Sequence, residues 1–119
     1  MSNVDPAPST TKMLQSSNVN EESDCYGMIT YTDVSGNSYT PSFVQWRLWD
    51  DTNQVLLQDW VSITPGPSNT VMVQAGQNTL GNSGNLTETR IIIFNVTAPG
   101  GISRYDELIY NLLALPDTP

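Results

Sequence analysis

The stretch SFVQWRLWDD, residues 42–51, decides the fold class. Val44, Trp46 and Leu48 alternate with polar residues, which is the two-residue repeat of a half-buried strand. A helix over the same residues would have no continuous apolar stripe, so a strand is the better interpretation. We therefore predict that Trp46 is buried at the centre of a small core and that Arg47 is exposed beside it.

Short stretches of the same kind lie on both sides of residues 42–51. Residues that favour β-structure, separated by turns of Gly, Pro, Asn and Asp, predict strands at 26–32, 43–49, 55–63, 70–74, 86–97 and 105–115. The segment 55–63 has apolar residues at both odd and even positions and is interpreted as a strand pair or one bent strand. The total of about seven strands predicts an all-β sandwich.

The last two segments, 86–97 and 105–115, hold the most apolar residues in a row and an ambiguous pattern, respectively. The run IIIF at 91–94 is apolar on both parities, which predicts a central strand covered on both faces. In 105–115, Leu108, Leu112 and Leu115 have helical spacing, whereas Leu108, Tyr110 and Leu112 alternate as in a strand. The aromatic and β-branched residues at the centre of this segment favour the strand.

Composition limits the classes of function. The 119 residues suffice for one domain, and 13% charged residues with eight Gly and eight Pro fit a β protein with frequent turns. Twelve acidic residues against four basic ones give a net charge of −8. This charge repels phosphate backbones, so nucleic-acid binding is not expected.

Histidine is absent from the chain, and Cys25 is its only cysteine. A histidine-based triad or metal site within one chain is thereby excluded, and so is an intrachain disulfide. No other motif indicates catalysis, so we predict no enzyme activity, no metal and no cofactor. No secretory signal and no apolar run long enough for a membrane helix is recognisable, and we expect a soluble intracellular product without membrane contact.

The N-terminal part differs in composition from the rest. Residues 1–24 are rich in Ser, Asn, Pro, Thr and Glu and hold few large apolar side chains. Such a segment buries too little surface to offset its ordering entropy, so it is either a flexible tail or an arm that a partner orders. In the second case Met13, Leu14 and Val19 are its anchors. Residues 25–119 then form the β-sandwich domain.

Acidic residues in two turns raise the question of a calcium site. Asp50 and Asp51 stand near Asn53, and Asp33 lies in the preceding turn. Oxygen ligands of this kind suit Ca²⁺, but the spacing matches no EF-hand loop. Asp and Asn are ordinary turn residues, and the turn is the preferred interpretation.

A second acidic group stands at the ends of two predicted strands. Asp106 and Glu107 with Glu88 have the chemistry of a carboxylate pair for acid–base work, but nothing in the sequence places them in a pocket. A solvated strand end is the preferred interpretation. Arg90 is then expected to form exposed cross-strand ion pairs with Asp106 or Glu107.

Two tryptophans besides Trp46 are candidates for a contact surface. Trp49 and Trp60 are expected on the face opposite Trp46, where exposed tryptophans anchor interfaces or stack on sugars. The polar loop at 75–85 is a further candidate contact. The alternative, which the pattern favours for the tryptophans, is a second half of the core or a covered edge.

Several short motifs occur along the predicted strands. They are Tyr31-Thr32-Asp33 with Gly36 and Pro41, Val44-x-Trp46-x-Leu48-x-Asp50, Glu88-Thr89-Arg90 before an apolar strand, and Asp106-Glu107 at the start of the last strand. With these motifs, residues 28–115 resemble the small fibronectin-III/immunoglobulin-like β-sandwich proteins of tailed-bacteriophage virions. The chain departs from fibronectin-III in lacking the tyrosine of the E–F corner.

The resemblance implies an Ig/fibronectin-III-like β-sandwich with an extended N-terminal arm. It also implies a non-enzymatic virion protein, most plainly a capsid decoration or cement protein. Such a protein is made in the host cytoplasm, binds the major capsid protein or another virion protein through its arm and one sheet, and forms homo-oligomers. The alternative is a carbohydrate- or receptor-binding Ig-like module on a capsid fibre or tail, with Trp49, Trp60 or the loop at 75–85 as the contact surface.

Overall fold

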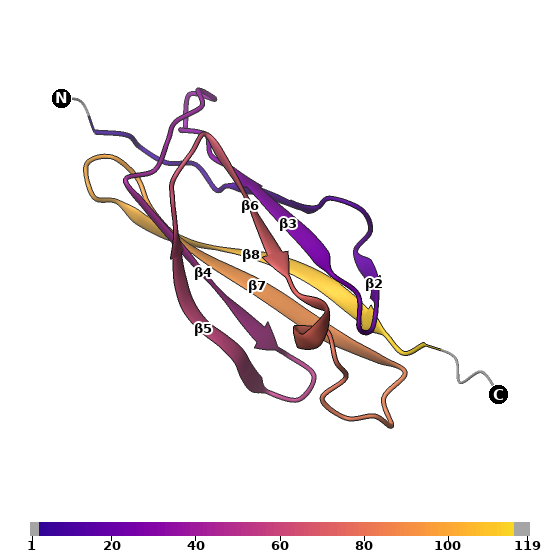
Figure 1. Ribbon diagram of the computed structural model, residues 1–119. Helices are drawn as coiled ribbons and strands as arrows, with labels where there is room; N and C mark the ends of the chain where they lie inside the picture. The colour runs from indigo at the N-terminus through magenta and orange to yellow at the C-terminus, as the bar shows by residue number, and fades with distance from the viewer. Residues whose placement is uncertain (1–2, 116–119) are drawn as a thin grey trace.

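A computed structural model describes residues 3–115 of the chain. Residues 1, 2 and 116–119, which include the ends of the predicted arm and of the predicted domain, lie outside this part. The described part holds eight strands in two sheets, which confirms the all-β prediction (Figure 1). The strands are β1 (Thr10–Met13), β2 (Asn18–Asn20), β3 (Cys25–Thr30), β4 (Phe43–Asp50), β5 (Val55–Ile63), β6 (Ser68–Val73), β7 (Thr87–Thr97) and β8 (Ser103–Leu113).

The two sheets have three and five strands. The order is β1-β3-β6 in one and β2-β8-β7-β4-β5 in the other, and every neighbouring pair is antiparallel except β2 with β8. Side chains from both sheets form one buried core between them, as expected when two half-buried sheets cover each other. Within residues 3–115, no helix has the length and apolar character to cross a membrane.

β4 follows the alternation of its sequence. Val44, Trp46 and Leu48 are buried, with Trp46 only 6% exposed, which confirms the predicted centre of the core. The prediction that Arg47 is exposed is wrong: its side chain is half-buried. Its guanidinium lies 4.7 Å from the centroid of the Trp60 ring, and a flat cation on an aromatic face gives up much of its contact with water.

β7 and β8 form the longest pair of the fold, eleven residues each. Their inward residues are buried in strict alternation, which confirms that the last element is a strand and not a helix. The prediction that β7 is covered on both faces is wrong, because Ile91 and Ile93 are only half-buried. A two-layer sandwich covers one face of each sheet, and these two side chains lie on the other face.

β5 is a single strand with two irregularities. Its register with β4 shifts between Trp46 and Leu48, and again between Leu48 and Trp49. Each shift places one extra β5 residue opposite β4, and such bulges change which face the following side chains occupy. This explains why the segment is apolar on both parities.

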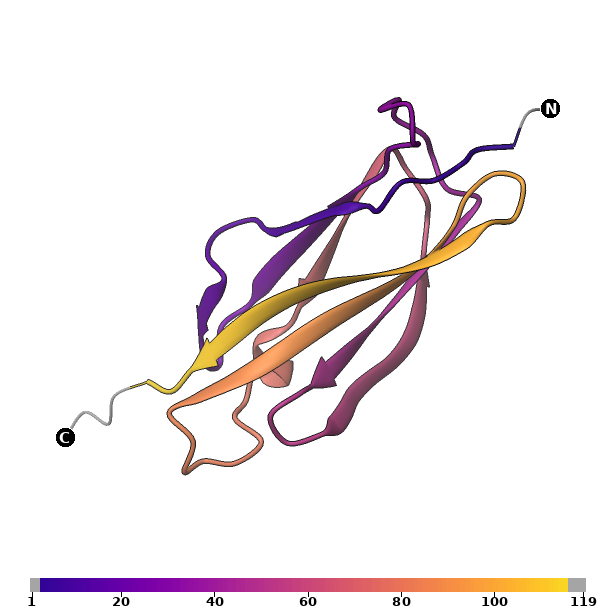
Figure 2. The same ribbon diagram turned by 180° about the vertical axis from the view of Figure 1, so that it is seen from behind.

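The N-terminal segment is part of both sheets. β1 pairs with β3, and after the exposed residues 14–17 the chain changes sheets, so that β2 lies beside β8 (Figure 2). Val19 is buried in the core, and Met13 packs against it. These two strands add to the prediction, while residues 55–63 form one strand and not a pair, so the described part has eight strands where about seven were predicted.

One glycine lies where the two sheets approach each other closely. A Cβ atom at Gly27 in β3 would stand 2.6 Å from Cδ2 of Leu108 and 3.1 Å from Cδ1 of Ile92. Both contacts are shorter than ordinary van der Waals distances. A side chain at this position of β3 would therefore require Leu108 to shift in the core.

Candidate functional site

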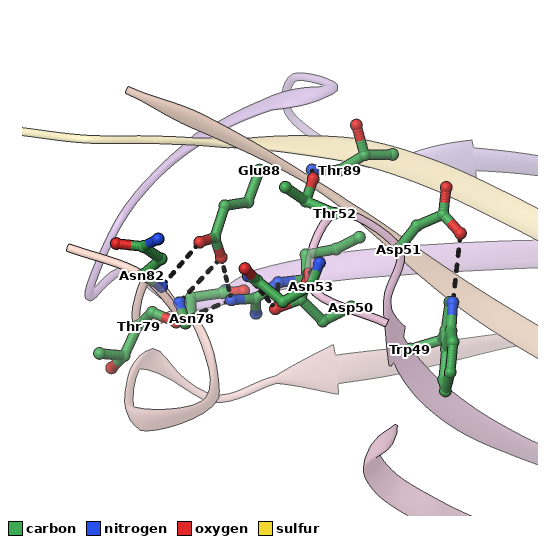
Figure 3. Close-up of polar contacts among 12 residues, drawn as sticks. Trp49, Asp50, Asp51, Thr52, Asn53, Asn78, Thr79, Asn82, Glu88 and Thr89 are labelled. Carbon is green, nitrogen blue, oxygen red and sulfur yellow. Dashed lines mark hydrogen bonds and ion pairs between the residues drawn. The ribbon is translucent and has the colours of Figure 1, made fainter. Parts of the chain in front are cut away.

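A buried arginine organises one end of the sandwich. Figure 3 shows Glu88, Asp50 and Asn53 at this end of the molecule. Arg90 is fully buried, and its Nη2 lies 3.0 Å from Oε1 of Glu88 while its Nε lies 3.7 Å from Oδ2 of Asp50. It also donates hydrogen bonds to the carbonyl oxygens of Gln77 and Thr79. The predicted exposed pairs of Arg90 with the acids of β8 are therefore wrong.

The strand register explains why Arg90 does not pair with the acids of β8. Arg90 stands opposite Tyr110 in β8, whereas Asp106 stands opposite Phe94. Four residues of strand separate these positions, about 13 Å at the usual rise. The sequence shows that the charges lie on neighbouring strands, but the offset between the strands depends on the loop that joins them.

Glu88 holds the loop between β6 and β7 in place. Its carboxylate accepts hydrogen bonds from the amides of Gly81 and Asn82, at 2.9 and 3.0 Å, and from Nδ2 of Asn85. Burial alone would raise the pKa of Glu88, but these hydrogen bonds outweigh it and lower the pKa from 4.5 to about 2. A carboxylate that stays ionised in this way is suited to a structural role and not to proton transfer near neutral pH.

The other candidate acids have structural partners too. Asp50 accepts hydrogen bonds from the backbone and side-chain nitrogens of Asn53, at 3.1 and 2.8 Å. Oδ1 of Asp33 accepts the amides of Ser35 and Asn37 within one turn. The turn interpretation of these residues is thereby confirmed, and the described residues hold no group of three or more acidic, cysteine or histidine side chains suited to a metal ion.

The loop at 75–85 is also anchored to the core, through Asn78. The side chain of Asn78 is buried, donates to the carbonyl oxygen of Ser23 at 2.7 Å and accepts the hydroxyl of Tyr110 at 2.7 Å. Cys25 lies beside it, and burial raises the pKa of its thiol. These contacts make this end of the molecule a rigid support and leave no reactive group open to solvent among the residues named.

A different kind of surface covers the outer face of the five-stranded sheet. Leu56, Trp49, Ile91 and Ile109 are successive register partners across β5, β4, β7 and β8. Leu56 is 42% exposed and Ile109 53% exposed, while Trp49 and Ile91 are half-buried. We call this apolar row the outer strip. Its residues face away from the core, because the buried residues of the same strands alternate with them.

An aromatic pair borders the outer strip. The rings of Trp60 in β5 and Tyr105 in β8 lie 6.1 Å apart, although two strands separate β5 from β8. Three strand spacings amount to about 14 Å, so the two rings must lean toward each other across the sheet. With Arg47, which stacks on Trp60, they form what we call the aromatic bridge.

Three exposed carboxylates lie beside these two features. Asp51 follows β4 and accepts the indole N–H of Trp49 at 3.2 Å. Asp59 shares with Trp60 the bulge opposite Arg47, and Glu107 lies on β8 opposite Ile93. All three acids are exposed, and we call them the acid rim.

The structure brings together only part of the predicted contact residues. Trp49 and Trp60 lie on one face, where both are half-buried and neither is part of the core. Val19 is in the core, Met13 packs against the core, and Leu14 is 45% exposed at the turn after β1. The partner-binding role proposed for the N-terminal anchors therefore has no place for Val19 in this conformation.

Sequence reasoning missed Leu56, Tyr105 and Ile109. The alternation that placed Leu108 and Tyr110 in the core also places Tyr105 and Ile109 outside, so the signal was present in β8. Leu56 could not be assigned to a face before the bulges of β5 were known.

Comparisons of the chain with models of protein families, with curated proteins and with solved structures find no significant match. The functional proposal therefore depends on the geometry of the chain and on the resemblance of its motifs.

Proposed function

We propose that this chain is a non-enzymatic structural protein that docks on a larger assembly through its outer strip. The carrying observation is the outer strip itself, an apolar row across four strands that the chain's own second sheet does not cover. Contiguous apolar patches of this kind on a folded protein mark interaction sites. The carboxylates of Glu88 and Asp50, by contrast, already have structural partners.

The motif resemblance supplies the identity of the assembly. We propose a tailed-phage virion, with the major capsid protein as partner and the chain as a decoration or cement protein that stabilises the shell. A protein of this kind binds at many lattice positions, so a modest surface on each copy is sufficient through avidity.

We also propose that the sandwich is of the Ig/fibronectin-III type. In that type, the first, second, fourth and fifth strands form one sheet and the third, sixth and seventh form the other. The order β1-β3-β6 against β8-β7-β4 agrees with this plan except for the fourth strand, which has no counterpart beside β6, when β5 is taken as an added strand beside β4 and β2 as a continuation of the first strand. Strand order is what supports this proposal.

Co-sedimentation with empty capsids of the phage that encodes the chain tests the proposed function. We expect the protein to pellet with the capsids, and Ile109→Asp to remain in the supernatant because a charge would be desolvated in the interface. Val34→Asp is the matched control, since Val34 is 65% exposed in the turn after β3 and belongs to neither named surface. Equal binding by both variants would remove the outer strip from the proposal.

One observation favours a second candidate, a carbohydrate-binding module. Tyr105 is 68% exposed beside Trp60, and exposed aromatic rings stack on sugar faces. A glycan array tests it: binding that Tyr105→Ala abolishes and Ile109→Asp leaves intact would select this candidate over the capsid protein.

A further inference from the structure

We infer that the partner surface which meets the outer strip is apolar at its centre and carries Lys and Arg at its margin. This inference rests on the proposed function and specifies the chemistry of its partner. Every member of the acid rim beside the outer strip is an exposed carboxylate.

The cations of the chain do not balance the acid rim. The sequence has four basic residues. Arg90 is fully buried, Lys12 lies on β1 in the other sheet, and Arg104 stands on the same side of β8 as the buried Asp106. Arg47 is the remaining one, and it lies on the outer face with its guanidinium stacked on Trp60, so one positive charge stands against three carboxylates.

This charge distribution decides between two occupants of the face. A second copy of the chain, packed face to face, would place two acid rims against each other and join two molecules of net charge −8. Like charges opposed across an interface are unfavourable, whereas opposite potentials attract and orient the partners. A basic margin on a different protein is therefore the complementary occupant.

The two features should act on different rate constants. Charges at the edge of an interface chiefly accelerate association, and they do so less at high ionic strength. Apolar side chains that are desolvated at the centre chiefly slow dissociation. The acid rim is thus expected to set the association rate, and the outer strip the dissociation rate.

The first experiment measures binding kinetics on immobilised empty capsids. For the double variant Asp59→Asn/Glu107→Gln we expect association slower by about three- to tenfold at low salt with dissociation unchanged, and a difference that vanishes near 0.5 M salt, where the Debye length is about 4 Å. Ile109→Ala is expected to dissociate faster with little change in association. The control pair Asp5→Asn/Glu22→Gln changes the net charge equally, and both residues are exposed outside the outer face.

An equal slowing by the control pair would overturn the inference, because net charge and not the acid rim would then guide binding. Salt-independent association of the wild-type protein would overturn it as well. Self-association of the wild-type protein through Ile109 in sedimentation experiments near neutral pH would assign the face to a second copy.

A second experiment separates this inference from the virion proposal. The probe is the peptide Ac-KLKLKLK-NH2, an apolar strand face with a basic margin, and the control probe is Ac-ELELELE-NH2. We expect the lysine peptide to shift the indole N–H signals of Trp49 and Trp60 but not that of the buried Trp46, and the acid-rim double variant to weaken this shift. This result without capsid binding would retain the inference and reject the virion partner; no preference for the lysine peptide would reject the inference even if capsids bind.

Discussion

At the scale of single residues, the three tryptophans divide the molecule into core and surface. Trp46 is 6% exposed, whereas Trp49 and Trp60 are half-buried on the opposite side of the same sheet. Replacing Trp46 with Ala should cost about 3–5 kcal/mol of the free energy of unfolding, because it leaves a large cavity. Trp49→Ala should cost only about 1–2 kcal/mol, because less of its surface is buried. Urea unfolding checks both values, and similar losses would contradict this division.

Glu88 is the residue that should govern stability in acid. Its pKa is depressed in the folded state to about 2, so it contributes stability above pH 4.5 that is lost as the pH falls toward 2. The shift corresponds to about 3 kcal/mol. Glu88→Gln should therefore be less stable than the wild type at pH 7 by at least about this amount, and the gap should narrow between pH 4.5 and 2.

Urea unfolding at several pH values measures the gap. Glu107→Gln, which removes an exposed carboxylate from β8, is the control and should show a small gap at every pH. A gap for Glu88→Gln that stays constant down to pH 2 would show that the depressed pKa does not stabilise the fold.

At the scale of elements, the N-terminal segment closes two edges of the sandwich. β1 covers the edge of β3, β2 covers the edge of β8, and Thr11 donates its hydroxyl to the carbonyl oxygen of Glu107. Deleting residues 1–24 should therefore lower the melting temperature by about 10 °C or more and promote aggregation through the unpaired edges. Circular dichroism and light scattering measure both effects. An unchanged melting temperature would support the prediction from composition that residues 1–24 are a flexible tail or an arm ordered only by a partner.

The elements also show how far the sequence could be read. The alternation of β4 and β8 was sufficient to predict these two strands and their buried faces, because period-two patterning depends on each strand alone. The partner of Arg90, the face of Leu56 and the meeting of Trp60 with Tyr105 depend on register and bulges. β1 and β2 are ordered because they pair with the edges of β3 and β8, which form elsewhere in the chain. The local composition, rich in Ser and Asn, gives no sign of these edges.

At the scale of the whole molecule, net charge and the outer strip have opposite effects on self-association. The isoelectric point is about 4.1, so the repulsion between copies that the net charge provides near neutral pH disappears close to pH 4. We expect self-association to be greatest there, through the outer strip. Light scattering from pH 7 to 3 tests this: Ile109→Asp should reduce the scattering, whereas Val34→Asp, with the same change in charge, should not.

The parallel pairing of β2 with β8 has a mechanical consequence. The first described residues and the end of β8 lie at opposite ends of the molecule (Figure 1), and β2 and β8 run in the same direction. Tension applied between the two ends of the chain would pull β2 and β8 past each other along their length. Their hydrogen bonds would then bear the load together instead of opening one after another. A short strand of three residues would in this way act as a clamp against stretching.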